Sequence, residues 1–103
     1  MPYRVKRGVV LVLSAPVDKL LGFLEDATAR AGLPFFTVTS GVEGAHRENS
    51  LHYEARALDV RNKNWKPAQI QIAYARLAEI RDRDKQPLRF LPETDHLHIE
   101  WRG

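Results

Sequence analysis

Two segments of the chain carry apolar residues at the spacing of an amphipathic helix. The first begins after Ser14, a residue type that caps helix N-termini, and ends at Gly32 and Pro34. The second opens at Pro67 and ends in the charged turn 81–87. A period near 3.6 residues places the apolar side chains of each segment on one face, which can pack against a sheet. The two apolar stripes consist of Val17, Leu20, Leu21, Leu24, Ala27 and Ala31, and of Ile70, Ala73, Tyr74, Leu77 and Ile80.

Short β-branched, aromatic or alternating segments predict strands around these helices. The continuous apolar segment 9–13 predicts either a buried strand or an extended lead-in that packs under the first helix. Segment 34–39 is aromatic and β-branched, which favours a strand entering the core. Segments 57–61, 88–91 and 96–101 predict further strands, the last two as antiparallel neighbours. The fold class we expect is α+β, with a small antiparallel sheet flanked by two main helices.

Alternation within two of these strands separates core residues from polar ones. In segment 57–61, Leu58 and Val60 face one side, and Asp59 faces the other. In the final strand, three polar side chains share one face and three apolar side chains share the opposite face. Segment 40–49 contains glycines among polar residues and therefore predicts an exposed loop. The polar face of the final strand consists of His96, His98 and Glu100, and its core face of Leu97, Ile99 and Trp101.

The composition indicates one folded domain, 1–103, without a disulfide framework. Of the 103 residues, 44% are hydrophobic and 28% are charged, which is ordinary for a globular domain and too apolar for a disordered chain. The formal net charge of +3 is spread among acidic residues, so a mixed-charge surface is a better interpretation than a nucleic-acid interface. Because there is no cysteine, any zinc must be held by histidine and carboxylate side chains.

The N-terminal residues resemble a signal peptide only superficially. Arg4, Lys6 and Arg7 precede the apolar segment 8–13, but a signal sequence needs roughly 7 to 15 apolar residues in a row. No segment approaches the ~20 apolar residues of a membrane span. We therefore expect no membrane span, a monomer, and synthesis in the cytoplasm with an export route that the sequence does not indicate.

Histidine and aspartate residues at separated positions can form a metal site. A catalytic zinc ion typically takes three protein ligands and keeps one position for water. His52, Asp59 and His98 make such a set, two of them on the polar sides of predicted strands. The alternative is that His96 and His98 form a solvated pair on an alternating strand.

Two motifs resemble the signature of a known enzyme group. Ser50-x-His52, followed seven residues later by Asp59, and then Asp95-His96-x-His98, look like the motifs of zinc peptidases that cleave peptidoglycan stem peptides. These are the D-alanyl-D-alanine carboxypeptidases and L-alanyl-D-glutamate endopeptidases, whose fold is shared by the Hedgehog signalling domain. The resemblance covers about residues 37–101 and includes the Hedgehog-like stretches 50–59 and 75–78.

The resemblance implies roles for residues of both motifs. It assigns zinc ligation to His52, Asp59 and His98. Asp95 matches the carboxylate that takes a proton from the attacking water, and Glu93 is the second choice for that role. His96 matches a histidine that stabilises the oxyanion. Glu100 is either a partner of a zinc ligand or a solvated side chain.

The resemblance is less complete in the stretch that would contact the substrate. Ser50 either binds the substrate backbone or caps a turn, and His46 matches a pocket histidine of the Hedgehog type. The arginine that binds the substrate carboxylate in this family is not in its usual place, and Arg47 is the nearest candidate. Ala55 replaces a glycine of the family pattern, a change that costs little unless φ is positive there.

The function we expect is therefore that of a zinc peptidase acting on peptidoglycan stem peptides. It would work in the bacterial cell envelope, or as a phage-encoded enzyme on the wall. The alternative is a zinc-containing, non-catalytic Hedgehog-like binding module. A basic nucleic-acid-binding domain is a third hypothesis, which the commitment of the aromatic residues to the core disfavours.

Overall fold

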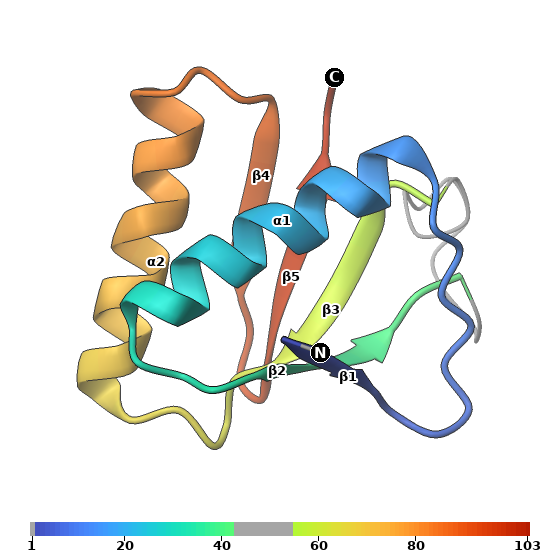
Figure 1. Ribbon diagram of the computed structural model, residues 1–103, viewed down its shortest axis with the longest axis horizontal. Helices are drawn as coiled ribbons and strands as arrows, with labels where there is room; N and C mark the ends of the chain where they lie inside the picture. Colours follow the sequence, from blue (N-terminus) through green and yellow to red (C-terminus); the bar gives the residue numbers. More distant parts are fainter. Residues whose placement is uncertain (1, 43–54) are drawn as a thin grey trace.

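The computed structural model describes residues 2–42 and 55–103, which form a five-stranded sheet and two helices (Figure 1). The strand order is β1-β2-β3-β5-β4. β1 pairs with β2 in parallel, and all other neighbours are antiparallel. The fold is thus α+β as predicted, but its sheet is mixed rather than wholly antiparallel. The elements are β1 (Tyr3–Val5), α1 (Ala15–Arg30), β2 (Phe36–Ser40), β3 (Ala57–Arg61), α2 (Pro67–Asp82), β4 (Leu88–Pro92) and β5 (His96–Trp101).

The boundaries of α1 follow from the capping residues that the sequence supplies. The Ser14 hydroxyl accepts a hydrogen bond from the Val17 N–H at 3.2 Å, which satisfies one of the unpaired donors at the helix start. The same hydroxyl donates to the Ala55 carbonyl at 2.6 Å, which ties the helix start to the residue two before β3. After the helix, Gly32 adopts a φ of 76°, a conformation that favours glycine. The predicted start and stop of this helix are confirmed.

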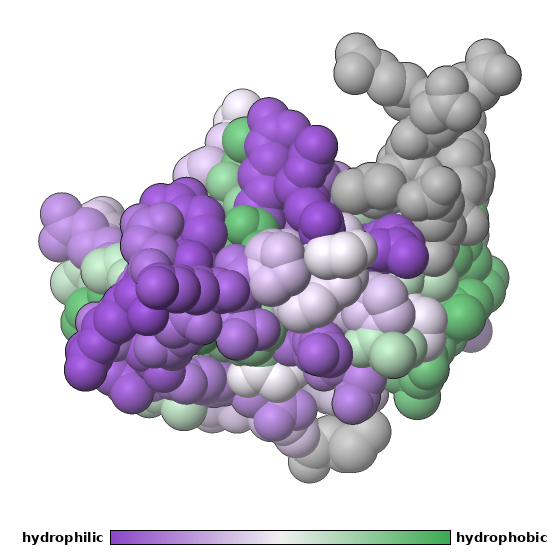
Figure 2. All heavy atoms as spheres, turned by 90° about the horizontal axis from the view of Figure 1, so that it is seen from above, coloured by the Kyte–Doolittle hydropathy of each residue, from purple (hydrophilic) through white to green (hydrophobic). Residues whose placement is uncertain are grey.

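The segment before α1 is not a strand, so the first of the two expectations for residues 9–13 is wrong. Val9 and Leu11 pack against the core, whereas Val10, Val12 and Leu13 are exposed. Figure 2 shows hydrophobic surface at its right-hand edge, on the side where Figure 1 places this segment. Residues 9–13 are thus an extended segment that leads into α1, with alternate side chains turned toward the core. The parallel edge strand of the sheet is β1.

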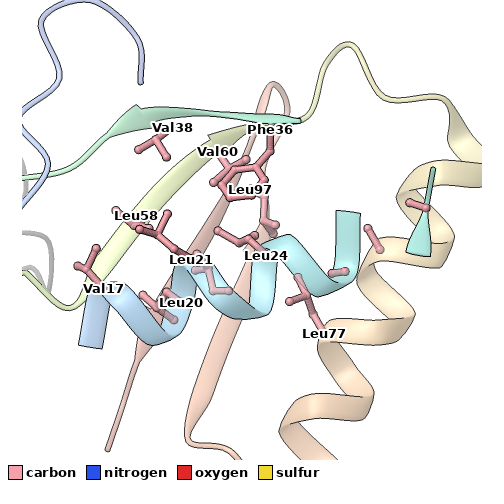
Figure 3. Packing of buried hydrophobic residues seen from close by; sticks show 14 of the residues in the cluster. Val17, Leu20, Leu21, Leu24, Phe36, Val38, Leu58, Val60, Leu77 and Leu97 are labelled. Atoms are coloured by element: carbon pink, nitrogen blue, oxygen red, sulfur yellow. The ribbon is translucent and has the colours of Figure 1, made fainter. Parts of the chain in front are cut away.

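The hydrophobic core lies between α1 and the sheet, with α2 packed beside α1 and next to β4 (Figures 1 and 3). Figure 3 shows the apolar side chains of α1 facing those of the strands. Leu58, Val60, Leu97 and Ile99 are all fully buried, as their alternation predicted. The core residues of α1 are Val17, Leu20, Leu21, Leu24 and Ala27, and those of α2 are Ala73 and Leu77. Neither helix is long and apolar enough to cross a lipid bilayer.

An ion pair joins the two helices. The guanidinium of Arg76 on α2 donates from Nε and Nη2 to the two carboxylate oxygens of Asp26 on α1, at 3.1 and 2.9 Å. Arg30, one turn further along α1, also donates to Asp26. The hydrogen bond from Arg76 is the main cause that holds the pKa of Asp26 below its ordinary value. The ionised form of Asp26 is therefore favoured in the folded chain.

We expect Asp26→Asn to lower the free energy of unfolding by about 1 kcal/mol at pH 7, a value kept small because the carboxylate is partly exposed and screened. Since the folded pKa of Asp26 is depressed, its contribution is present above the unfolded pKa of about 3.9 and is lost as the pH falls through the lower folded value. Urea unfolding at pH 7 and pH 2 measures this. Glu25→Gln is the matched control, because Glu25 forms no salt bridge with any residue of the described ranges.

Candidate functional site

The register of β3 and β5 brings the two sequence motifs together. Asp59 lies directly opposite His98, and Arg61 lies directly opposite His96. Side chains that are paired across antiparallel strands share a face of the sheet. Because Leu58, Val60, Leu97 and Ile99 occupy the core face, these polar residues project from the opposite face, away from α1. The prediction that Asp59 and His98 each lie on the polar side of a strand is confirmed, and the register shows that the two sides are one face.

Asp59 and His98 form the central contact of this face. The His98 Nδ1 atom lies 2.9 Å from the Asp59 Oδ1 atom, although the residues are 39 positions apart in the chain. Both side chains are mostly shielded, with 19% and 17% exposed for His98 and Asp59. The hydrogen bond to Asp59 is the main cause that raises the pKa of His98, against the opposing effect of burial. A negative and a positive charge are thereby favoured side by side.

The other nitrogen of His98 is held by a buried carboxylate. His98 Nε2 lies 2.9 Å from Glu100 Oε1, and the Arg102 guanidinium donates to the second oxygen of Glu100. Glu100 is only 6% exposed. Burial opposes its ionisation, but the hydrogen bonds from His98 and Arg102 outweigh this effect and lower the pKa of Glu100. Of the two alternatives left open by the sequence, the structure shows Glu100 as a partner of His98 rather than as a solvated side chain.

Asp95 and His96 form a second pair beside the first. His96 Nδ1 lies 2.8 Å from Asp95 Oδ1, and His96 Nε2 lies 4.0 Å from Asp59 Oδ2. The hydrogen bond with His96 is the main cause that lowers the pKa of Asp95, and the charge of Lys63 adds to it. Glu93, by contrast, closes the turn through its backbone N–H, which donates to the His96 carbonyl. The Asp95 side chain is therefore connected to Asp59 through His96, whereas Glu93 contacts His96 through its backbone.

A polar hollow of about 260 Å³ opens on this face. Asp59, Asp95 and His96 line it together with side chains that the sequence analysis did not select. Arg61 could have been found from the sequence, because alternation puts it on the same side of β3 as Asp59. The others come from distant parts of the chain, which only the tertiary structure brings together. The described residues that line it are Lys6, Thr39, Ser40, Asp59, Arg61, Lys63, Asp95 and His96.

Four of the predicted site residues, His46, Arg47, Ser50 and His52, lie outside the described residues. Within residues 2–42 and 55–103, no three histidine, aspartate or glutamate side chains are grouped as metal ligands. Asp59 and His98 can supply two ligands of the types that zinc prefers. Two donors bonded tetrahedrally to one zinc at about 2.0–2.1 Å lie about 3.3 Å apart. The observed 2.9 Å is a hydrogen-bond distance, so a zinc ion bound here would take the place of the shared proton.

Ala55 is in the conformation that penalises a side chain. Its φ is 53°, in the left-handed region, and the residue is buried. A Cβ in this region costs roughly 1–2 kcal/mol. The family pattern has a glycine at this position, so the alanine found here carries the cost of a side chain at positive φ. The residue lies just before β3, the strand that contains Asp59.

No protein-family model, curated protein or solved structure matches this chain. The likeness to the zinc peptidases therefore depends on the two motifs quoted above.

Proposed function

We propose that this chain is a zinc-dependent peptidase that hydrolyses peptide bonds of peptidoglycan stem peptides. It would belong to the group of D-alanyl-D-alanine carboxypeptidases and L-alanyl-D-glutamate endopeptidases, with the fold they share with the Hedgehog signalling domain. The observation that carries the proposal is the contact between Asp59 and His98, because these residues belong to two motifs that this group uses for metal ligation. The enzyme would act on the bacterial wall, encoded by the bacterium or by a phage.

The ligands would be His52, Asp59 and His98. Bound zinc would supply polarisation of the peptide carbonyl and activation of a water for attack. Glu100 orients His98, because a hydrogen bond from Nε2 to this carboxylate directs Nδ1 toward Asp59 and the open face. The Arg102 guanidinium in turn fixes Glu100. The shielded position of this chain of contacts keeps the His98 ring in one orientation.

Asp95 and His96 would move protons and stabilise charge. Asp95 is an exposed carboxylate and is ionised at neutral pH like an ordinary aspartate, so it can accept the proton of the attacking water and pass it to the leaving amine. His96 lies between Asp95 and Asp59, where its Nε2 atom can donate to an oxyanion on the open face. A positioned donor of this kind is typically worth about 3 kcal/mol of transition-state stabilisation.

A zinc-containing, non-catalytic Hedgehog-like binding module is the second candidate. The observation that favours it is the lowered pKa of Asp95, since a general base works best when its pKa is near the working pH. Such a module would keep the Asp59 and His98 contact as a structural feature and use the open face to bind a partner. Measurement of hydrolysis separates the two candidates.

The purified chain is expected to contain one zinc ion per molecule and to release soluble fragments or free D-alanine from purified sacculi. Elemental analysis and mass spectrometry of the digest measure both quantities. Removal of the metal with a chelator should abolish the release, and added zinc should restore it, because the metal supplies the activated water. A chain that holds no zinc and cleaves no bond of the stem peptide contradicts the proposal.

A further inference from the structure

Three cationic side chains meet at the hollow beside the Asp59 and His98 pair. Lys6 follows β1, Arg61 ends β3, and Lys63 lies in the connection to α2. None of the three forms a salt bridge within residues 2–42 and 55–103. Elsewhere in those ranges, arginines such as Arg76 and Arg102 are paired with carboxylates. Cations that converge without a salt-bridge partner form a place where an anion is stabilised.

The carboxylates in the wall of the hollow do not neutralise these cations at close range. Asp59 is hydrogen-bonded to His98, and Asp95 is hydrogen-bonded to His96. Among the described residues that line the hollow, three cations accompany two carboxylates, so this wall favours an anion. The fork of an arginine also matches the two oxygens of a carboxylate. An anion with a planar pair of oxygens, such as the substrate carboxylate of the proposed function, therefore fits the hollow.

The hollow also offers neutral polar groups and a limited volume. A register shift in β2 between Val38 and Ser40 places Ser40 beside Asp59, and both Thr39 and Ser40 line the hollow. The volume of about 260 Å³ lies below the roughly 300–1,000 Å³ of complete small-molecule pockets. The hollow can thus hold the end of a ligand while the remainder lies across the open face.

We propose that Lys6, Arg61 and Lys63 bind the free carboxylate of a peptide ligand whose adjacent peptide bond lies at the Asp59 and His98 pair. This identification of the ligand rests on the proposed function, but the binding of a carboxylate can be measured without hydrolysis. Arg61 is the central residue, because it extends from the same strand and the same face as Asp59. These residues select the ligand and take no part in proton transfer.

The test is an NMR titration of the purified chain with N-acetyl-D-alanyl-D-alanine and with its C-terminal amide. The free acid is expected to bind at least tenfold more tightly than the amide. Arg61→Gln should lower the preference for the acid to about twofold. Lys63→Gln should divide the preference of the unsubstituted chain by about three. Because Lys63 is exposed, its substitution leaves the fold intact and keeps the test valid if Arg61→Gln unfolds the chain.

The matched control is Arg83→Gln, at the exposed end of α2, which should keep the full preference for the acid. Equal binding of acid and amide by the unsubstituted chain, or a preference that survives both substitutions in the hollow, overturns the inference. The same spectra report hydrolysis of the probe. A preference for the acid without hydrolysis supports the carboxylate site and counts against the carboxypeptidase type, whereas digestion of sacculi tests the peptidase of either type, so the two proposals fail separately.

Discussion

Replacing Asp59 with alanine is expected to weaken zinc binding by about 70-fold to 1,000-fold. The apparent binding energy of a four-ligand structural zinc site is about 10–16 kcal/mol, so that one ligand is worth roughly 2.5–4 kcal/mol. The substitution also leaves His98 Nδ1 without its contact to Oδ1. Competition with a coloured chelator measures the affinity, and elemental analysis measures the zinc content after dialysis.

The control for this experiment is Asp95→Ala, which removes a neighbouring carboxylate that is not among the proposed ligands. Its zinc affinity should equal that of the unsubstituted chain. If Asp59→Ala binds zinc as tightly as the control does, Asp59 is not a ligand, and its contact with His98 is only a cross-strand pair.

The Asp95→Ala variant is also expected to lower kcat/KM for stem peptides by about 10²-fold to 10⁴-fold, the usual contribution of a positioned general base. The melting temperature should hardly change, because Asp95 is highly exposed and its only hydrogen-bond partner among the described side chains is His96. Steady-state kinetics on a soluble stem peptide, together with zinc analysis, separates loss of the base from loss of the metal.

Glu93→Ala is the matched comparison, since it removes the other carboxylate of the same turn. We expect it to keep most of the activity, because its side chain does not line the hollow. A large loss with Glu93→Ala and none with Asp95→Ala would transfer the role of base to Glu93. Zinc bound stoichiometrically by an inactive unsubstituted chain would instead favour the binding module.

The helices and the central strands could be predicted from the sequence because their signals are local. A stripe of period 3.6 and a capping serine define α1, and strict alternation defines β3 and β5. β1 was missed because Tyr3–Val5 is too short to show a pattern and pairs with a strand that lies beyond α1. The β-branched composition of residues 9–13 favours a strand as one of two expectations. In the structure only Val9 and Leu11 of this segment pack against the core.

The candidate site was predictable only in part for a related reason. The motifs indicated which residues belong together, and the structure places Asp59 opposite His98 and His96 beside Asp95. The motifs did not indicate the register, nor the arrival of Lys6 and Lys63 at the same hollow, because these depend on the strand order. The metal itself, the fold family and the contribution of His52 stay predictions.

The strand order also determines how the sheet meets other molecules. β1 and β4 are its two outer strands, and an exposed outer strand can recruit another chain and start aggregation. β1 is only three residues long and is followed by Lys6, whereas β4 carries the exposed Arg89 and ends at Pro92, which has no N–H to donate. Both borders therefore oppose the addition of a further strand, so a concentrated solution of this protein should resist growth into fibrils.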